Sequence, residues 1–397
     1  MKTLSGVFLA IAVASGAEAG QFGEEVAFLK KHTPVLLLTD EAGLAQVAVV
    51  PAWQGRVMTS TDAGAEGLSY GWINRELIAS GKLQRHMNAF GGEDRFWMGP
   101  EGGQFAIFFA PGVPFDFEHW QTPAALDTEP FEVVSRARDQ VRFGRRIQLV
   151  NHSGTRFDVR VDREVRMVPA ADVWREFGTP PVAGLSVVGY ESVNRLSNAG
   201  QTTWTPRTGL LSIWILGMFN AAPETTVVVP IRAGDEAALG KRVNADYFGP
   251  VPAERLVAEE QTVYFRADGR YRSKIGFSPA RCKPVLGSYD AQAGVLTVVQ
   301  FTLPQGPAKY VNSEWKLQED PFRGDVSNSY TDDGKMGAFY ELESSSPAAE
   351  LAPGQTLEHT HRTVHLRGSE AALDAVARAT LGAGLERIKT ALPKLPK

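Results

Sequence analysis

The apolar positions along the chain follow mainly the pattern of β-strands. Runs rich in Val, Ile and Phe are separated by Gly, Pro, Asn and Asp, which is typical of strands joined by turns. The runs predicted as strands are 35–38, 46–53, 56–59, 104–110, 131–137, 140–150, 156–167, 210–219, 225–231, 263–266 and 296–303. So many strands, with few helical periods, favour a mainly β sandwich or barrel over an alternating β/α fold.

Helices are predicted only near the two ends of the chain. Residues 23–32 are predicted as a short helix with Phe28 and Leu29 as its apolar contacts. A second helix is predicted at about 369–389, because apolar residues recur there with a 3.6-residue period and Ser369 is a suitable first residue. No repeat or low-complexity linker interrupts the chain. The simplest expectation is one domain over residues 20–397.

The first residues have the features of a secretory signal peptide. Lys2 is followed by an apolar run over residues 4–13, which is too short to cross a bilayer as a helix. Ala17 and Ala19 then give the small-x-small pattern of a cleavage site. We therefore expect cleavage after Ala19 and an exported protein, periplasmic or extracellular. No later stretch is apolar enough to be a transmembrane segment.

Composition narrows the range of partners. The formal net charge of −4 argues against a nucleic-acid partner, which requires a basic face. Cys282 is the only cysteine, so no disulfide can form within the chain, and a buried apolar role suits it better than a reactive one. The sequence leaves the oligomeric state open.

Residues 86–103 combine charge, an aromatic ring and five glycines within one loop-sized stretch. Carboxylates and arginine bind sugar hydroxyls, and an aromatic face packs against the apolar side of a sugar ring, so this mixture is typical of a carbohydrate site. The candidate ligand-binding residues in it are Glu93, Asp94, Arg95, Trp97 and Glu101. The alternative is a structural loop in which Arg95 pairs with a neighbouring carboxylate. Two candidates from other segments are His119, in an aromatic and acidic cluster, and Asn194, which also suits a turn.

Residues 339–366 carry the most specific pattern. Glu341 and Glu343 are two apart in a predicted strand and therefore share a face. After a turn, His359, His361 and His365 share a face of the next strand if that strand is unbroken. Carboxylates and imidazoles on paired strands indicate acid–base chemistry or a site for a divalent metal ion, with His359, His361 and Glu341 as ligands. A solvated polar face and a buried metal-free network are the alternatives.

Other chemistry is less specific. Lys274 suits either a buried base or a donor to sugar hydroxyls, and Asp325 with Asn328 and Tyr330 forms a further polar group. The chain has no phosphate-binding glycine loop, no G-x-S-x-G and no H-E-x-x-H. These absences disfavour NTPases and the hydrolases that use those motifs.

Three short motifs resemble the galactose mutarotase-like (aldose 1-epimerase) superfamily. They are Leu342-Glu343 with Pro347 followed by Leu351-Ala352-Pro353-Gly354, then Gly91-Gly92 before Arg95, and Gly55-Arg56-Val57. The chain looks closest to a branch of secreted bacterial proteins of unknown function. The resemblance implies a β-supersandwich with a concave sugar-binding face, a short helix at the N-terminus and a helix at the C-terminus. It also implies that Glu343 is the catalytic base and that Arg95 binds sugar.

One departure from that family affects the predicted chemistry. Its general acid is a mid-chain histidine, but no histidine occurs here between His152 and His359, and Trp214 falls near that position. The acid is therefore sought elsewhere, among His86, His119, Lys274 and the final-strand histidines. Of these, His361 and Lys274 are the predicted catalytic residues that join Glu343. Three hypotheses stay open: a sugar isomerase, epimerase or lyase acting by proton transfer, a non-catalytic carbohydrate-binding protein, and a metal-binding sugar-processing protein.

Overall fold

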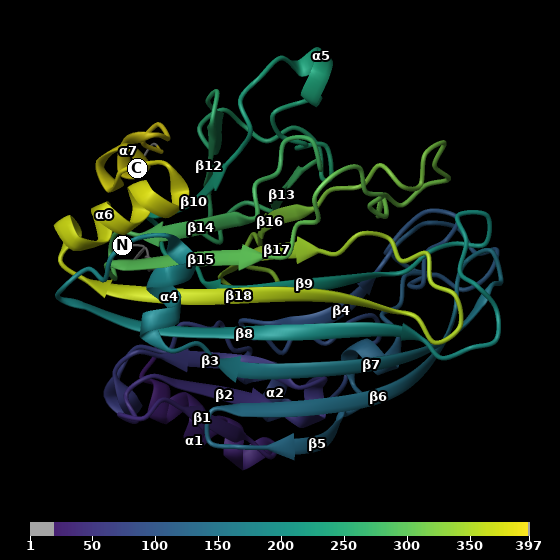
Figure 1. The fold of residues 1–397 in the computed structure, drawn as a ribbon, viewed down its shortest axis with the longest axis horizontal. Helices are drawn as coiled ribbons and strands as arrows, with labels where there is room; N and C mark the ends of the chain where they lie inside the picture. The colour runs from purple at the N-terminus through teal and green to yellow at the C-terminus, as the bar shows by residue number, and fades with distance from the viewer. Residues whose placement is uncertain (1–19, 396–397) are drawn as a thin grey trace, which may run out of the picture.

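A computed structural model describes residues 20–395, so the predicted signal peptide at 1–19 lies outside the described residues. Within them the strands form three antiparallel sheets of ten, five and three strands (Figure 1). No helix in this part of the chain is long and apolar enough to span a membrane.

The ten-stranded sheet is the largest layer. Two long strands near one edge of it, at 140–150 and 156–167, alternate between buried and exposed side chains, as expected where one face of a sheet is solvated. Its strands, in spatial order, are β11 (Leu256–Ala258), β12 (Thr262–Arg266), β10 (Thr225–Pro230), β14 (Val285–Asp290), β15 (Val295–Phe301), β18 (Thr356–Gly368), β8 (Leu185–Asn198), β7 (Arg156–Met167), β6 (Gln140–Val150) and β5 (Glu132–Arg136).

The five-stranded sheet packs behind it. Its strands, in spatial order, are β13 (Ser273–Phe277), β16 (Ser327–Thr331), β17 (Phe339–Ser345), β9 (Ser212–Asn220) and β4 (Arg95–Gly99). Phe96, Val159 and Ile215 belong to one buried apolar cluster that joins this sheet to the larger one. A small sheet of β1 (Leu36–Thr39), β2 (Gln46–Val50) and β3 (Arg56–Thr61) completes the layers.

Short helices cover the sheets. They are α1 (Phe22–His32), α2 (Arg75–Ser80), α3 (Ala124–Asp127), α4 (Ala170–Phe177), α5 (Glu236–Leu239), α6 (Glu370–Leu381) and α7 (Leu385–Thr390), with 3-10 turns η1 (Pro51–Trp53) and η2 (Gly64–Glu66). Helix α6 packs on β14, β15 and β18, as Figure 1 shows in yellow at the upper left. The predicted C-terminal helix is thus two helices, since Gly382 ends α6 with a left-handed φ of 70°.

Several predicted elements need correction. The apolar run 104–110 is not a strand but a buried turn region, in which Phe108 and Phe109 contact other rings. The prediction for 46–53 extended a strand through η1, and helices α2 and α4 were not predicted. Strand β8 was also missed. Asn194 lies inside β8 rather than in a turn, because β7 and β18 pair with it on both sides.

Candidate functional site

Strand β17 separates two polar groups because successive side chains of a strand point to opposite faces. The Tyr340 hydroxyl contacts Ser288 of β14, and the Ser344 hydroxyl contacts histidines of β18, so these residues face the ten-stranded sheet. Glu341 and Glu343 face the other way. We call that opposite side of the five-stranded sheet the site face.

Cross-strand pairing places the residues of the site face side by side. Glu343 lies opposite Leu216 of β9, which in turn lies opposite Arg95 of β4. Two pairs further along, Trp97 lies opposite Trp214. These residues therefore share a face with Glu341, as directly opposed positions of antiparallel strands do. Residues from three separate parts of the sequence meet here only because the sheet assembles.

Glu343 is fully buried and is held through one of its two oxygens. Its Oε2 accepts hydrogen bonds from Lys274 Nζ and from Trp214 Nε1, each at 2.9 Å. Its Oε1 is buried and has no hydrogen-bond partner among the described residues. A buried carboxylate oxygen without a partner costs free energy, so it marks a place where a ligand can donate a hydrogen bond.

Glu341 has a perturbed carboxyl. Burial raises its pKa to about 7, against the lowering influence of Arg95, and Glu343 raises the pKa further through its charge and through the close approach of the two carboxyl groups. Arg95 Nη2 lies 3.1 Å from Glu341 Oε1, while the buried Arg95 Nε has no partner among the described residues. Arg95 Cζ also lies 4.2 Å from the centre of the Trp97 ring, a cation–π contact.

Lys274 stays a cation in this environment. Burial lowers its pKa, but the carboxylates of Glu343, Glu101 and Glu341 raise it, and the net change is upward. Its Nζ lies 4.8 Å from the centre of the Trp214 ring. Lys274 therefore lies beside Glu343 as a hydrogen-bond donor that keeps its proton.

Glu101 extends the group toward the loops. Burial raises its pKa, while Lys274 and the Trp315 indole lower it, and the Trp120 indole is also close enough to lower it. Trp120 Nε1 nevertheless is buried and makes no hydrogen bond with a described residue. Of the predicted ligand-binding residues, Arg95, Trp97 and Glu101 thus belong to the group around Glu343.

A second polar group lies beside Lys274. The Asp325 carboxylate accepts hydrogen bonds from the Tyr247 hydroxyl at 2.6 Å and from Asn244 at 2.9 Å. Asn328 donates to the Tyr247 hydroxyl at 3.1 Å, and the Tyr247 ring centre lies 5.6 Å from Lys274 Nζ. Burial raises the pKa of Asp325.

The histidines of β18 lie on the other side of β17, which corrects two predictions. His359 Nε2 and His361 Nδ1 each lie 2.8 Å from Ser344 Oγ, between the two large sheets. Strands β17 and β18 belong to different sheets and are not paired. His361 is therefore not on the face of Glu343 and is not positioned as its acid partner.

The predicted metal-ligand set is also not assembled. Glu341 pairs with Arg95 on the site face, whereas His359 and His361 share Ser344 on the opposite face. Within residues 20–395, no group of three or more His, Cys, Asp or Glu side chains is placed to hold a metal ion. The two imidazoles instead share a buried hydrogen-bond network with the Ser344 hydroxyl.

These two histidines are expected to make the fold sensitive to acid. Burial lowers the pKa of His359 to about 3 and that of His361 to about 4, while their usual value is about 6.5. Below pH 6.5 these two histidines bind protons in the unfolded chain but stay neutral in the folded chain. The stability that is present above that pH is therefore lost as the pH falls. Together the two histidines should lower the free energy of unfolding by about 2 kcal/mol between pH 6.5 and 5.5.

The measurement is urea unfolding at both pH values for wild type and for His359→Gln/His361→Gln, so that other titrating groups, such as Glu341, cancel in the difference. Glutamine keeps a hydrogen-bonding group near Ser344. His119→Gln is the control, because His119 is exposed and pairs with Asp116 at 2.6 Å. An equal pH dependence in wild type and the double variant would contradict the assignment.

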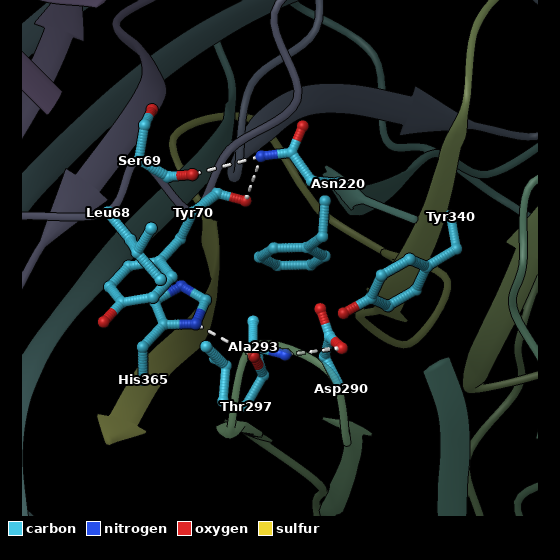
Figure 2. Close-up of a pocket in the computed structure, with 11 residues that line it drawn as sticks. Leu68, Ser69, Tyr70, Asn220, Asp290, Ala293, Thr297, Tyr340 and His365 are labelled. Carbon is cyan, nitrogen blue, oxygen red and sulfur yellow. Dashed lines mark hydrogen bonds between the residues drawn. The ribbon is translucent and has the colours of Figure 1, made fainter. Parts of the chain in front are cut away.

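His365 belongs to a third environment, shown in Figure 2. Its Nδ1 lies 2.9 Å from the Thr297 hydroxyl, and its ring stacks on Tyr70 with centroids 4.3 Å apart. These residues line a cavity of about 40 Å³. That volume suits water but is far below the roughly 300 Å³ of the smallest typical ligand pockets. His365 therefore does not line a space for a sugar.

The remaining predicted residues have structural contacts. Glu93 binds His365 Nε2 at 3.0 Å and also accepts from Ser60 and Tyr190. Asp94 and Asn194 bind the buried Arg163, each at 2.6 Å. His119 lies in an exposed loop beside Asp116. None of these four predicted residues contacts Glu343 or Glu341.

Sequence reasoning missed part of the group. Trp214 lies in a strand so apolar that its sequence does not distinguish it from core, and Trp315 and Tyr247 come from loops without a distinctive pattern. The cluster over 115–120 was noticed, and it supplies Trp120. Of the predicted group of Asp325, Asn328 and Tyr330, the first two share a network with the Tyr247 hydroxyl, whereas Tyr330 donates to Asp332 instead.

Comparison with known proteins agrees with the fold. Residues 20–392 match the profile of a family described as a family of unknown function, DUF6786. The chain belongs to the DUF6786 family. A search of curated proteins finds no match to this DUF6786 sequence.

Two solved structures place this DUF6786 chain among known folds. An Escherichia coli K12 protein provisionally assigned as an aldose 1-epimerase is 12% identical with a TM-score of 0.50, covering 85% of this chain and 99% of its own. The Slr1438 protein of Synechocystis sp. PCC 6803 is 15% identical with a TM-score of 0.51, covering 85% and 96%. The mainly β, galactose mutarotase-like fold is therefore confirmed. Identities this low establish the fold and not an activity.

Proposed function

We propose that this protein binds a sugar on the site face of its five-stranded sheet and exchanges a proton with it through Glu343. The observation that carries the proposal is the buried Glu343 carboxylate, fixed through Oε2 and without a partner at Oε1. A carboxylate oriented by two donors, with one oxygen left for a substrate hydroxyl, has the arrangement of a general base.

The surrounding residues suit a sugar ring. Trp97 and Trp214 lie edge to face with centroids 5.5 Å apart and provide apolar surface beside the carboxylates. The Arg95 Nε–H is a buried donor without a partner among the described residues. Hydrogen-bond donors and acceptors beside aromatic rings match the alternation of hydroxyls and C–H surfaces on a pyranose.

The two glutamates are suited to different roles. Ring opening of a cyclic sugar requires a base to take the proton of the anomeric hydroxyl and an acid to protonate the ring oxygen as its bond to the anomeric carbon breaks. Glu343, held by the Lys274 cation, takes the first role. Glu341, whose pKa is raised to about 7, retains a proton near neutral pH and takes the second. No histidine is required on the site face.

One observation favours a second candidate function, sugar binding without turnover. The resemblance to mutarotases places a histidine acid near the position of Trp214, and the Trp214 indole only donates to Glu343. A site that lacks that acid can retain its affinity for sugar while losing the reaction.

Nuclear magnetic resonance distinguishes these candidates. We expect the purified protein to bind at least one aldose in a panel of free hexoses and pentoses, seen as quenching of tryptophan fluorescence by the ligand beside Trp97 and Trp214. For the bound aldose, we expect faster exchange between its α and β anomers in proton exchange spectra. Binding without faster exchange supports the second candidate, and absence of binding across the panel contradicts both.

A further inference from the structure

A chain of aromatic rings runs from Glu343 to the molecular surface. Trp214, which donates to Glu343, contacts Trp97, and the Trp97 ring lies 5.1 Å from Phe108. Phe108 stacks on Trp120 at 5.9 Å. Trp120 in turn stacks on Trp315 at 5.8 Å and on Phe117 at 6.2 Å, with interplanar angles of 23° and 17°. This series of rings extends further toward the surface than a single sugar ring beside Glu343 would need.

The outer end of this chain is exposed although it is aromatic. Phe117 is 62% exposed, and Trp315 is partly exposed. Charged residues border Phe117, since Glu118 pairs with Arg85 and Asp116 with His119. The exposed Phe117 ring is thus continuous with a buried aromatic stack and bordered by charged side chains.

Polar groups accompany the stack. Trp120 is buried, and its Nε1–H has no hydrogen-bond partner among the described residues. The Glu101 carboxyl lies close to this indole and to that of Trp315, and it also interacts with Lys274 of the site face. A donor and an acceptor next to stacked rings repeat, on a smaller scale, the combination found around Glu343.

We propose that Phe117, Trp120, Trp315 and Glu101 form a second sugar-binding subsite, so that the ligand is an oligosaccharide whose terminal ring lies at Glu343. This inference rests on the proposed function. The continuity of the ring chain with Trp214 favours a saccharide attached to the first ring over an unrelated apolar partner. The Trp120 N–H and the neighbouring Glu101 carboxyl favour a ligand that carries hydroxyl groups.

The probes are glucose, galactose, xylose and N-acetylglucosamine, each compared with α-1,4- and β-1,4-linked tetrasaccharides of the corresponding sugar where these exist. Isothermal titration calorimetry gives the affinities. We expect at least one tetrasaccharide to bind about tenfold or more tightly than its monosaccharide. Phe117→Ala, at an exposed position that tolerates truncation, should remove about tenfold of the tetrasaccharide affinity and leave the monosaccharide affinity unchanged.

Two further variants complete the test. Trp120→Phe keeps an aromatic ring and removes the free N–H, so it should also weaken the tetrasaccharide selectively. Tyr271→Ala is the control, because Tyr271 is an exposed ring beside Arg255 outside the ring chain. Equal monosaccharide and tetrasaccharide affinities, or no effect of Phe117→Ala, would overturn the subsite and leave the proposed function standing. Absence of binding to every probe would overturn both.

Discussion

Replacing the buried Arg163 by alanine is expected to lower the free energy of unfolding by about 3–5 kcal/mol. The Arg163 guanidinium lies between the sheets without exposure, 2.6 Å from the equally buried Asp94 carboxylate. It also donates to Asn194 Oδ1 and to the Gly55 carbonyl. Truncation leaves the Asp94 charge buried with only the Ser192 hydroxyl as a side-chain donor, and that uncompensated charge causes the large cost.

Arg160→Ala is the matched control for this prediction. Arg160 lies on the same strand, β7, and also pairs with an aspartate, Asp162, at 2.7 Å, but both side chains are largely exposed. Solvent screens such a pair, so its loss should change stability by about 0.5 kcal/mol or less. Urea unfolding followed by circular dichroism measures both. Similar losses of stability in the two variants would contradict the prediction, because the buried Asp94 charge would then be stabilised by groups other than Arg163.

The same network explains why Glu93 and Asp94 resemble ligand-binding residues in the sequence. They immediately precede β4, which carries Arg95 and Trp97 to the site face. Asp94 is fixed by Arg163, and Glu93 is fixed by Ser60, Tyr190 and His365. A dense run of charge beside a site can thus anchor the strand that bears the site. Local sequence does not distinguish anchoring from ligand contact, because both need buried, hydrogen-bonded charge.

The sequence predicted strands best where the alternation of apolar and polar residues is strong. Strands β6 and β7 have the predicted bounds, because each has one face in the core and one in solvent. Strand β8 was missed because Asn194 suggests a turn. Its neighbours β7 and β18 override that local preference by pairing along its length, and Arg163 satisfies the Asn194 side chain. Such tertiary effects are not visible in a window of residues.

The site was predictable in part for a similar reason. That Glu341 and Glu343 share a face follows from strand periodicity alone, and the structure agrees. Which sheet the next strand joins does not follow from periodicity, so the histidines of β18 were placed on the wrong side of β17. Arg95 is 246 residues from Glu341, and only the assembled order of β17, β9 and β4 brings them together.

Glu343→Gln is expected to have the largest effect on any sugar reaction of this protein. Glutamine has nearly the shape of glutamate and can still accept hydrogen bonds from Lys274 and Trp214, so the sheet should fold and the sugar should bind with similar affinity. It cannot take up the proton of a substrate hydroxyl at Oε1. Loss of a general base typically costs about 10²–10⁴-fold in rate, and we expect a decrease of that size in anomer exchange.

The pH dependence provides a second and independent readout of the same substitution. The Glu343 charge is one of the influences that raise the pKa of Glu341, so removing it should lower that pKa from about 7. Arg95→Met should shift it in the opposite direction, because Arg95 lowers the Glu341 pKa. Carbon-13 spectra of labelled glutamate side chains measure both shifts. Glu358→Gln, an exposed glutamate paired with Arg195, is the control and should leave the Glu341 titration unchanged.

If Glu343→Gln retains sugar affinity and wild type shows no turnover, Glu343 acts as a hydrogen-bond acceptor for a bound sugar. If the variant exchanges anomers as fast as an active wild type, the base lies elsewhere on the site face.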